Sequence, residues 1–147
     1  MDKKYQITVN EHQLNLIAAC IEDCARFLCG QTELWHTTSQ LPKNYIELRE
    51  KLEELQPLVT PDLPKGASYG WNGGNCPDEW QRKMIAETYY LYRTMLYALH
   101  KDDDNNNVYT SPALRCADSG EVIEIKEIEK PFKISTDYKT GAMVISE

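Results

Sequence analysis

The stretch from residue 77 to residue 100 constrains the fold most, because its apolar side chains surround a helix on most sides. Pro77 suits the first helical position, and Asp78 and Glu79 suit the first turn, where the helix dipole favours acidic groups. The apolar positions that follow are Trp80, Met84, Ile85, Tyr89, Leu91, Tyr92, Met95, Leu96 and Leu99. Such a helix is central to a bundle or lies in an interface. We therefore expect a helix ending near His100 and a homo-oligomer that covers its surplus apolar surface.

A second helical pattern starts near the N-terminus. Asn10 can cap a helix, and Glu11 favours its first turn. Apolar residues then recur at intervals of three and four, at Leu14, Ile17, Ala18, Ile21, Ala25 and Leu28. Glu22 and Arg26 are four residues apart, and we expect them to form an outward-facing ion pair. Gly30 is a natural stop, so the pattern predicts a helix that ends just before it.

The middle of the chain combines a weaker helix with a glycine-rich loop. A helix is expected from about Lys43 to Leu55. Its apolar side consists of Tyr45, Leu48, Leu52 and Leu55, and the prolines expected to end it are Pro57, Pro61 and Pro64. Residues 66–77, GASYGWNGGNCP, hold four glycines together with Tyr69 and Trp71. This composition predicts an irregular loop that carries aromatic rings.

The C-terminal third has a different pattern. Residues 101–107, KDDDNNN, form a polar connector. From Val122 to Ile128 apolar and charged residues alternate, as in a half-buried strand. A hairpin is expected from two short apolar runs, Phe132–Ile134 and Met143–Ile145, which flank a turn at Asp137–Gly141.

These patterns define one α+β domain over residues 1–147, mainly helical. About three helices are expected to pack as a small bundle over residues 10–100, followed by a β-rich part over about 108–147 with short strands and a hairpin. A chain of 147 residues with 41% apolar and 27% charged residues can bury a single core. Folding into one domain is therefore expected.

The charge balance excludes some classes of partner. The formal net charge of −7 repels phosphate backbones and anionic lipids, so we expect no nucleic-acid and no membrane binding. The N-terminal residues lack the apolar core of a signal peptide, and no run of about eighteen apolar residues occurs. The expected location is the cytoplasm.

The cysteines predict thiols rather than disulfides or a metal site. Their number, five, is odd, and reduced cysteines are usual in a cytoplasmic protein. Cys20 and Cys24 stand among apolar residues of the first helix, so we interpret them as core residues. Asp102, Asp104 and Asn106 alternate like the first ligands of a calcium loop. However, Asn107 and Ala113 replace the glycine and the glutamate that such a loop needs, and no metal is expected.

No catalytic motif emerges either. The glycines at 70, 73 and 74 fit neither of the phosphate-binding patterns GxGxxG and GxxxxGK[ST], and no cofactor is expected. His12, His36 and His100 are scattered, and none stands in a triad-like arrangement. The sequence therefore predicts a protein that is not an enzyme.

The remaining candidate site is aromatic. It consists of Tyr69, Trp71, Tyr89, Tyr92, Arg93, Tyr109 and Ser111. Aromatic faces beside an arginine can hold a planar or anionic ligand by stacking and charge-assisted hydrogen bonds. The alternative interpretation is that these residues serve core and interface packing.

Three segments, ITVNEHQLNLIAACIEDCARFLCGQTEL, ASYGWNGGNCPDEWQRKMIAETYYLYR and NNNVYTSPAL, resemble small proteins encoded in phage and prophage regions of gut anaerobes. The resemblance spans roughly Ile7 to Lys126 and leaves out the part from Pro131 onward. It implies a phage accessory role in the cytoplasm of a host cell, and no catalytic residue.

The leading functional hypothesis is a non-enzymatic accessory protein that binds a host protein or ligand through the glycine-aromatic loop and the third helix. The alternative is an anti-defence protein that sequesters a small signalling nucleotide. A small hydrolase is the third possibility.

Overall fold

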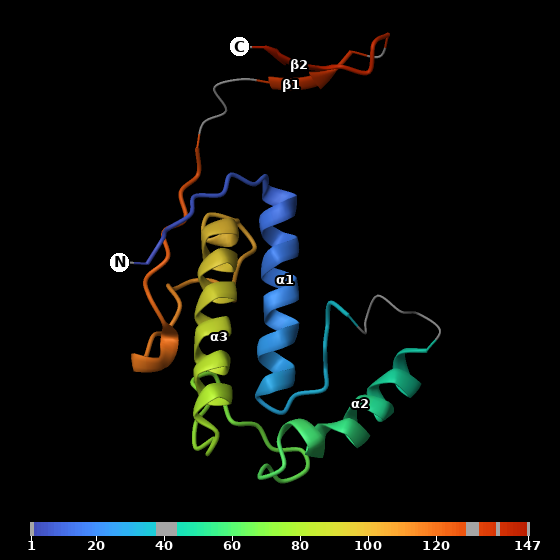
Figure 1. Ribbon diagram of the computed structural model, residues 1–147, viewed down its shortest axis with the longest axis vertical. Helices are drawn as coiled ribbons and strands as arrows, with labels where there is room; N and C mark the ends of the chain where they lie inside the picture. Colours follow the sequence, from blue (N-terminus) through green and yellow to red (C-terminus); the bar gives the residue numbers. More distant parts are fainter. Residues whose placement is uncertain (1, 38–43, 129–132, 138, 147) are drawn as a thin grey trace.

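The computed structural model describes residues 2–37, 44–128, 133–137 and 139–146. The protein is mainly helical and contains the three helices that the sequence predicts (Figure 1). In chain order the elements are α1 (Glu11–Leu28), α2 (Tyr45–Val59), α3 (Glu79–His100), a 3-10 turn η1 (Ala117–Ser119), β1 (Lys133–Thr136) and β2 (Met143–Ser146).

The core lies between α1 and α3, which run antiparallel, side by side (Figure 1). Ala18 and Ala25 of α1 pack against Tyr92 and Leu96 of α3. The small alanine side chains leave room for the large ring opposite them. Ile85 is 1% exposed, and burial of such a side chain stabilises the fold by about 1.5–3 kcal/mol. The long helix of the sequence prediction is therefore central to this core.

Side-chain caps fix where both helices begin. Asn10 and Gln13 form a capping box on α1, with each side-chain oxygen accepting from the backbone N–H of the other residue at 2.8–3.0 Å. The predicted Asn10 cap is confirmed. Asp78 caps α3 by accepting from the Gln81 N–H at 2.7 Å, so Pro77 precedes the cap and is not the first helical residue.

Helix α2 does not join a bundle, contrary to expectation. None of its residues, all of which the structure describes, is buried, and it projects away from the other two helices (Figure 1). Its C-terminal end is anchored by Thr60, which is 1% exposed, and by Gln56, whose Nε2 donates to the Phe27 carbonyl at 3.2 Å. An exposed ion pair of Arg49 with Glu33 at 3.7 Å joins the first half of the helix to the 31–37 segment. The helix also continues through Pro57, which was expected to end it. Pro57 has no backbone N–H, so the helix loses one hydrogen bond there and ends two residues later at Val59.

The segment after α3 returns along the outer side of that helix. Tyr90 OH accepts from the Ile123 N–H at 3.1 Å, and the Arg115 guanidinium lies 4.8 Å from the centre of the Tyr90 ring. Arg82 forms an ion pair with Asp118 at 3.1 Å. The strand expected from Val122 to Ile128 is wrong, because these residues are irregular and half-exposed to exposed. Alternation alone does not make a strand when no neighbouring strand supplies a ladder.

Beyond this segment, β1 and β2 form an antiparallel hairpin with Lys133 opposite Ser146 and Thr136 opposite Met143. Its turn is closed by hydrogen bonds from Asp137 N to Ala142 O and from Gly141 N to Asp137 O. Phe132, the first residue of the predicted hairpin, lies outside the described residues.

The cysteines are placed differently from the expectation. All five belong to the described part of the chain, and all are free thiols. Cys29 and Cys76 are buried, but Cys20 and Cys24 are exposed. Their interpretation as core residues is therefore wrong, because Ala18 and Ala25 occupy the side of α1 that meets α3. None of the described helices has the length and apolarity that a membrane span needs.

Candidate ligand-binding site

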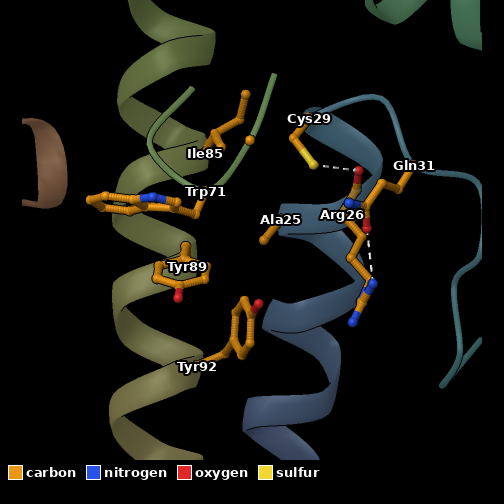
Figure 2. Close-up of a pocket in the computed structure, with 9 residues that line it drawn as sticks. Ala25, Arg26, Cys29, Gln31, Trp71, Ile85, Tyr89 and Tyr92 are labelled. Carbon is orange, nitrogen blue, oxygen red and sulfur yellow. Dashed lines mark hydrogen bonds between the residues drawn. The ribbon is translucent and has the colours of Figure 1, made fainter. Parts of the chain in front are cut away.

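Three aromatic rings line a cavity of about 190 Å³ between α1, α3 and the loop 66–77 (Figure 2). Trp71 of the loop lies 5.4 Å from Tyr89, and Tyr89 lies 5.5 Å from Tyr92, between ring centres. The second pair is edge to face, with an interplanar angle of 79°. Ala25 and Ile85 complete the apolar wall. The site is therefore an aromatic cleft backed by the core of the helix pair.

The glycines of the loop hold Trp71 in place. Gly73 has a φ of +79°, and a Cβ there would come within 2.9 Å of the Arg82 Cα. At Gly74, with a φ of +46°, a Cβ would meet the Tyr69 carbonyl oxygen at 2.2 Å. Only glycine fits both turns. The Tyr69 N–H donates to the Cys29 carbonyl at 2.8 Å, which ties the loop to the end of α1.

The opposite side of the cavity is polar and belongs to α1. Arg26 Nε and Nη2 donate to Glu22 Oε1 at 3.0 and 2.8 Å, and Nη1 donates to Gln31 Oε1 at 2.9 Å. His36 Nε2 lies 2.9 Å from Glu22 Oε2. Glu22 is 8% exposed, so the predicted ion pair exists but does not face outward. Every guanidinium nitrogen of Arg26 already has a partner within the protein.

A second buried carboxylate fixes the segment that carries His36. Asp23, 6% exposed, accepts from the backbone N–H of Thr37 at 2.7 Å and from its hydroxyl at 2.6 Å. It also accepts from the His36 N–H at 3.3 Å. The adjacent carboxylates of Glu22 and Asp23 therefore hold the 31–37 segment against α1. This segment supplies Gln31 to the wall of the cavity.

Two tyrosines and one cysteine at or near the cavity have raised pKa values. Burial and the nearby Glu22 carboxylate raise the pKa of Tyr92 well above its usual range. The same two causes raise the pKa of Tyr109. Burial also raises the pKa of the Cys29 thiol, although Ser68 and Arg26 oppose the shift. These groups are therefore neutral hydrogen-bond donors rather than bases or nucleophiles at neutral pH.

Size and charge decide what the cavity can hold. Its volume of about 190 Å³ is below the roughly 300–1,000 Å³ of most drug-sized ligand pockets. An apolar cavity of about 150 Å³ holds a benzene molecule, so one aromatic ring system is the appropriate size. The Arg26 charge is balanced by Glu22. The arrangement suits an uncharged planar group that stacks on the rings.

The structure brings together part of the sequence-predicted site. Trp71, Tyr89 and Tyr92 share the cavity. Arg93 and Tyr109 form a separate pair beside it, with the guanidinium carbon 4.8 Å from the ring centre. Tyr109 also stacks on His100 at 5.5 Å. Arg93 is thus engaged by an aromatic ring of the protein itself.

Tyr69 and Ser111 lie elsewhere. Tyr69 lines a wider hollow of about 440 Å³ whose walls are loop residues between 62 and 77, and Ser111 is exposed. This second hollow has no helix side chain in its wall, so its shape depends on the loop alone. We therefore take the helix-backed aromatic cavity as the candidate site.

Sequence reasoning missed the contribution of α1. The spacing of Glu22 and Arg26 predicts their ion pair, but it does not show that His36 and the 31–37 segment cover them. Cys29 and Gln31 stand next to the helix stop at Gly30, and no pattern distinguishes them from other end residues. Within the described part of the chain, no group of three His, Cys, Asp or Glu residues could hold a metal ion.

Comparison of the chain with protein families, with curated proteins and with solved structures finds no match.

Proposed function

We propose that the protein is a non-enzymatic binding protein that holds an uncharged planar ligand in the aromatic cavity. The observation that carries the proposal is the convergence of Trp71, Tyr89 and Tyr92 on one cavity against the packed helix pair. Aromatic side chains favour a flat ligand because a planar ring system can stack on the face of any of them.

The state of the polar groups supports binding without turnover. Burial and Glu22 keep Tyr92 protonated, and burial keeps the Cys29 thiol protonated, so neither is poised to attack a bound molecule. Arg26 and Gln31 present a satisfied hydrogen-bonded pair at the rim. In this proposal they orient the ligand, while the three rings supply most of the contact area.

The pairing of the nearby arginines favours an uncharged ligand over a nucleotide held by its phosphates. A sponge for a signalling nucleotide needs cations for the phosphates, but Arg26 is paired with Glu22 and Arg93 lies over Tyr109. The nucleotide alternative therefore requires the base in the cavity and the phosphates in solvent. A phage accessory role in the host cytoplasm, implied by the resemblance, belongs to the same proposal.

The test begins with mass spectrometry of small molecules released when the purified protein is heated. Binding is then measured for a panel of free purines and pyrimidines and for their 5′-monophosphates. We expect the free bases to bind at least as tightly as the monophosphates. Trp71→Ala should weaken binding at least about tenfold, since it removes one stacking face. It should change stability by about 1 kcal/mol or less, because Trp71 is only half-buried.

Tyr69→Ala is the matched control, because it removes an aromatic ring from the same loop but from the other hollow. Equal loss in both variants would mean that the loop as a whole, rather than the cavity, was disrupted. Monophosphates that bind more than tenfold tighter than bases would favour the nucleotide sponge. Absence of both release and binding would contradict the proposal.

We also propose that the C-terminal part, which the sequence predicts as a hairpin, takes no part in the site. The cavity is lined only by residues between Ala25 and Tyr92. A chain ending at residue 128 should therefore bind the same ligand with unchanged affinity.

A further inference from the structure

The hydroxyl of Tyr92 is a buried polar group without a hydrogen-bond partner at the wall of the aromatic cavity. The residue is 8% exposed and packs in the core of the helix pair with Ala18, Ala25 and Leu96. In the part of the chain that the structure describes, no hydrogen bond engages its hydroxyl. Since nearly all buried side-chain polar groups have a partner, this hydroxyl requires an explanation.

The Tyr92 oxygen is not sealed inside the protein. Among the described residues, the unpaired side-chain atoms closed off from solvent are Gln56 Oε1 and Arg93 Nε. The Tyr92 oxygen is not one of them, although the residue is buried, and Tyr92 lines the cavity. Figure 2 shows its ring between α3 and α1, with the hydroxyl on the α1 side. We therefore take the cavity as the space from which the hydroxyl is reached.

The ring that carries this hydroxyl is held in place by its neighbours. It meets the Tyr89 ring edge to face, with 5.5 Å between ring centres, and Ala18 and Ala25 pack against it from α1. Rotation about the C–O bond remains free and can turn the proton towards a nearby acceptor. A donor whose side chain is ordered before binding loses little conformational entropy when a ligand arrives.

The hydroxyl is available as a donor to a ligand. Burial, followed by the Glu22 charge, raises the pKa of Tyr92, so the proton stays on the oxygen at neutral pH. Each oxygen of the Glu22 carboxylate already has a donor, Arg26 on Oε1 and His36 on Oε2. The carboxylate that acts on Tyr92 electrostatically is thus engaged by other groups.

Gln31 adds a second donor to the wall of the cavity. Its Oε1 accepts from Arg26 Nη1 at 2.9 Å. Because a guanidinium offers only donors, the amide oxygen must face Arg26, and the NH₂ group is the free end. That nitrogen has no partner among the described residues. The polar groups left free by Tyr92 and Gln31 therefore both carry protons to donate.

We propose that the ligand of this cavity is a heteroaromatic molecule with a hydrogen-bond acceptor, a ring nitrogen or a ring carbonyl, on one edge, and that the Tyr92 hydroxyl donates to that acceptor. This inference rests on the proposed function and narrows it from any uncharged planar ligand to one with an acceptor. Trp71 and Tyr89 supply stacking faces, while Tyr92 discriminates between rings of the same shape. A ring with only C–H groups on that edge leaves the hydroxyl unpaired, which lowers affinity.

The test compares probes of one shape. Quinoline and isoquinoline carry a ring nitrogen at the two kinds of position in the bicycle, and naphthalene carries none. Equilibrium dialysis measures their dissociation constants for the natural protein and for Tyr92→Phe, which keeps the ring and removes the hydroxyl. We expect the variant to bind the better nitrogen probe about tenfold more weakly and naphthalene with unchanged or higher affinity. The ratio of the two constants, compared between proteins, cancels the difference in hydrophobicity between the probes.

Tyr90→Phe is the matched control. Tyr90 is 4% exposed on the same helix, but its hydroxyl accepts from the Ile123 N–H at 3.1 Å and it does not line the cavity. It should leave the ratio unchanged, and circular dichroism verifies that both variants keep their helices.

The outcomes separate this inference from the proposed function. If Tyr92→Phe weakens all three probes equally, or leaves the ratio unchanged, the acceptor inference is overturned while the cavity remains a binding site. An equal change of the ratio in Tyr90→Phe would overturn it as well, because the effect would then not come from the cavity. If neither the probes nor the free bases bind the natural protein, the proposed function fails and this inference fails with it.

Discussion

Helices α3 and α2 have the same kind of apolar pattern, but α3 is packed in the core and α2 is exposed. Both carry apolar residues at intervals of three and four, and both form. Helix α3 buries Ile85, Tyr90, Tyr92 and Leu96, whereas no residue of α2 is buried. Periodicity thus predicts the helix, while the position of its neighbours decides whether the apolar side becomes core.

The connections explain why α2 lies apart. Its C-terminal end is fixed at the last turn of α1 through Gln56 and the buried Thr60. From that anchor α2 extends outward, away from α1 and α3 (Figure 1), and none of its residues is buried. By contrast α3 starts at the same end of α1 and runs back along it. Side-chain exposure therefore differs sharply between two helices of similar pattern.

The largest effect is expected from a change in the core of the helix pair. Ile85→Ala removes a fully buried side chain and leaves a cavity, so the free energy of unfolding should fall by about 2–5 kcal/mol. Urea denaturation followed by circular dichroism measures it. A loss below about 1 kcal/mol would show that the contact of α1 with α3 is much looser than described.

The next effect concerns the buried ion pair. Glu22→Gln leaves the Arg26 charge without its carboxylate, and it should cost about 1–3 kcal/mol, because the Arg26 side chain is 29% exposed and water compensates in part. Glu54→Gln breaks the exposed pair with Lys51 on α2 and should cost well under 1 kcal/mol. Thermal unfolding of the two variants at low salt makes the comparison. Equal losses would place Glu22 in water.

A pH-dependent effect follows from the raised pKa of Tyr92. The folded state holds this proton more tightly than the unfolded state, whose phenol titrates near pH 10. The buried Tyr92 proton contributes its full stabilisation below the pKa of the unfolded phenol. The free energy of unfolding should fall as the pH rises above that value. Tyr92→Phe should make the alkaline decline shallower. Tyr5→Phe, whose ring is 83% exposed, should leave the decline unchanged.

The smallest effect is expected in α2. Leu58→Ala should change the free energy of unfolding by less than about 0.5 kcal/mol, since Leu58 is 81% exposed. Hydrogen exchange sharpens the contrast, because amides of residues 45–59 should exchange at least about tenfold faster than those in the middle of α1 and α3. Protection of α2 equal to that of α3 would indicate a partner for its apolar side.

Much of the fold could be predicted from the sequence because it depends on local signals. The Asn10 cap and the Gly30 stop bound α1, and the apolar circumference of the third helix indicates a central position. The way the helices pack against each other could not be predicted. Cys20 and Cys24 match the apolar pattern of α1, but the pattern does not tell which of its two apolar sides meets α3.

The candidate site also has one part that could be predicted from the sequence and one that could not. Its aromatic half, Trp71, Tyr89 and Tyr92, could be predicted because aromatic rings near a glycine-rich loop are conspicuous in a sequence. Its polar half depends on Glu22 and His36, which are fourteen residues apart, and on loop placement that no spacing rule describes. Pairing of distant polar groups is a tertiary property, so only the structure provides it.

The end of α1 is completed by a residue synthesised much later. Gln81 Nε2 donates to the Leu28 carbonyl at 2.7 Å across 53 residues of sequence. At a translation rate of about 5–20 residues per second, the last residue of α1 is synthesised roughly 3–11 s before Gln81, and the rest of α3 follows later still. During that interval both apolar sides of α1 are open to other nascent chains and to chaperones. Production of this protein should therefore depend on chaperone supply more steeply than its size suggests.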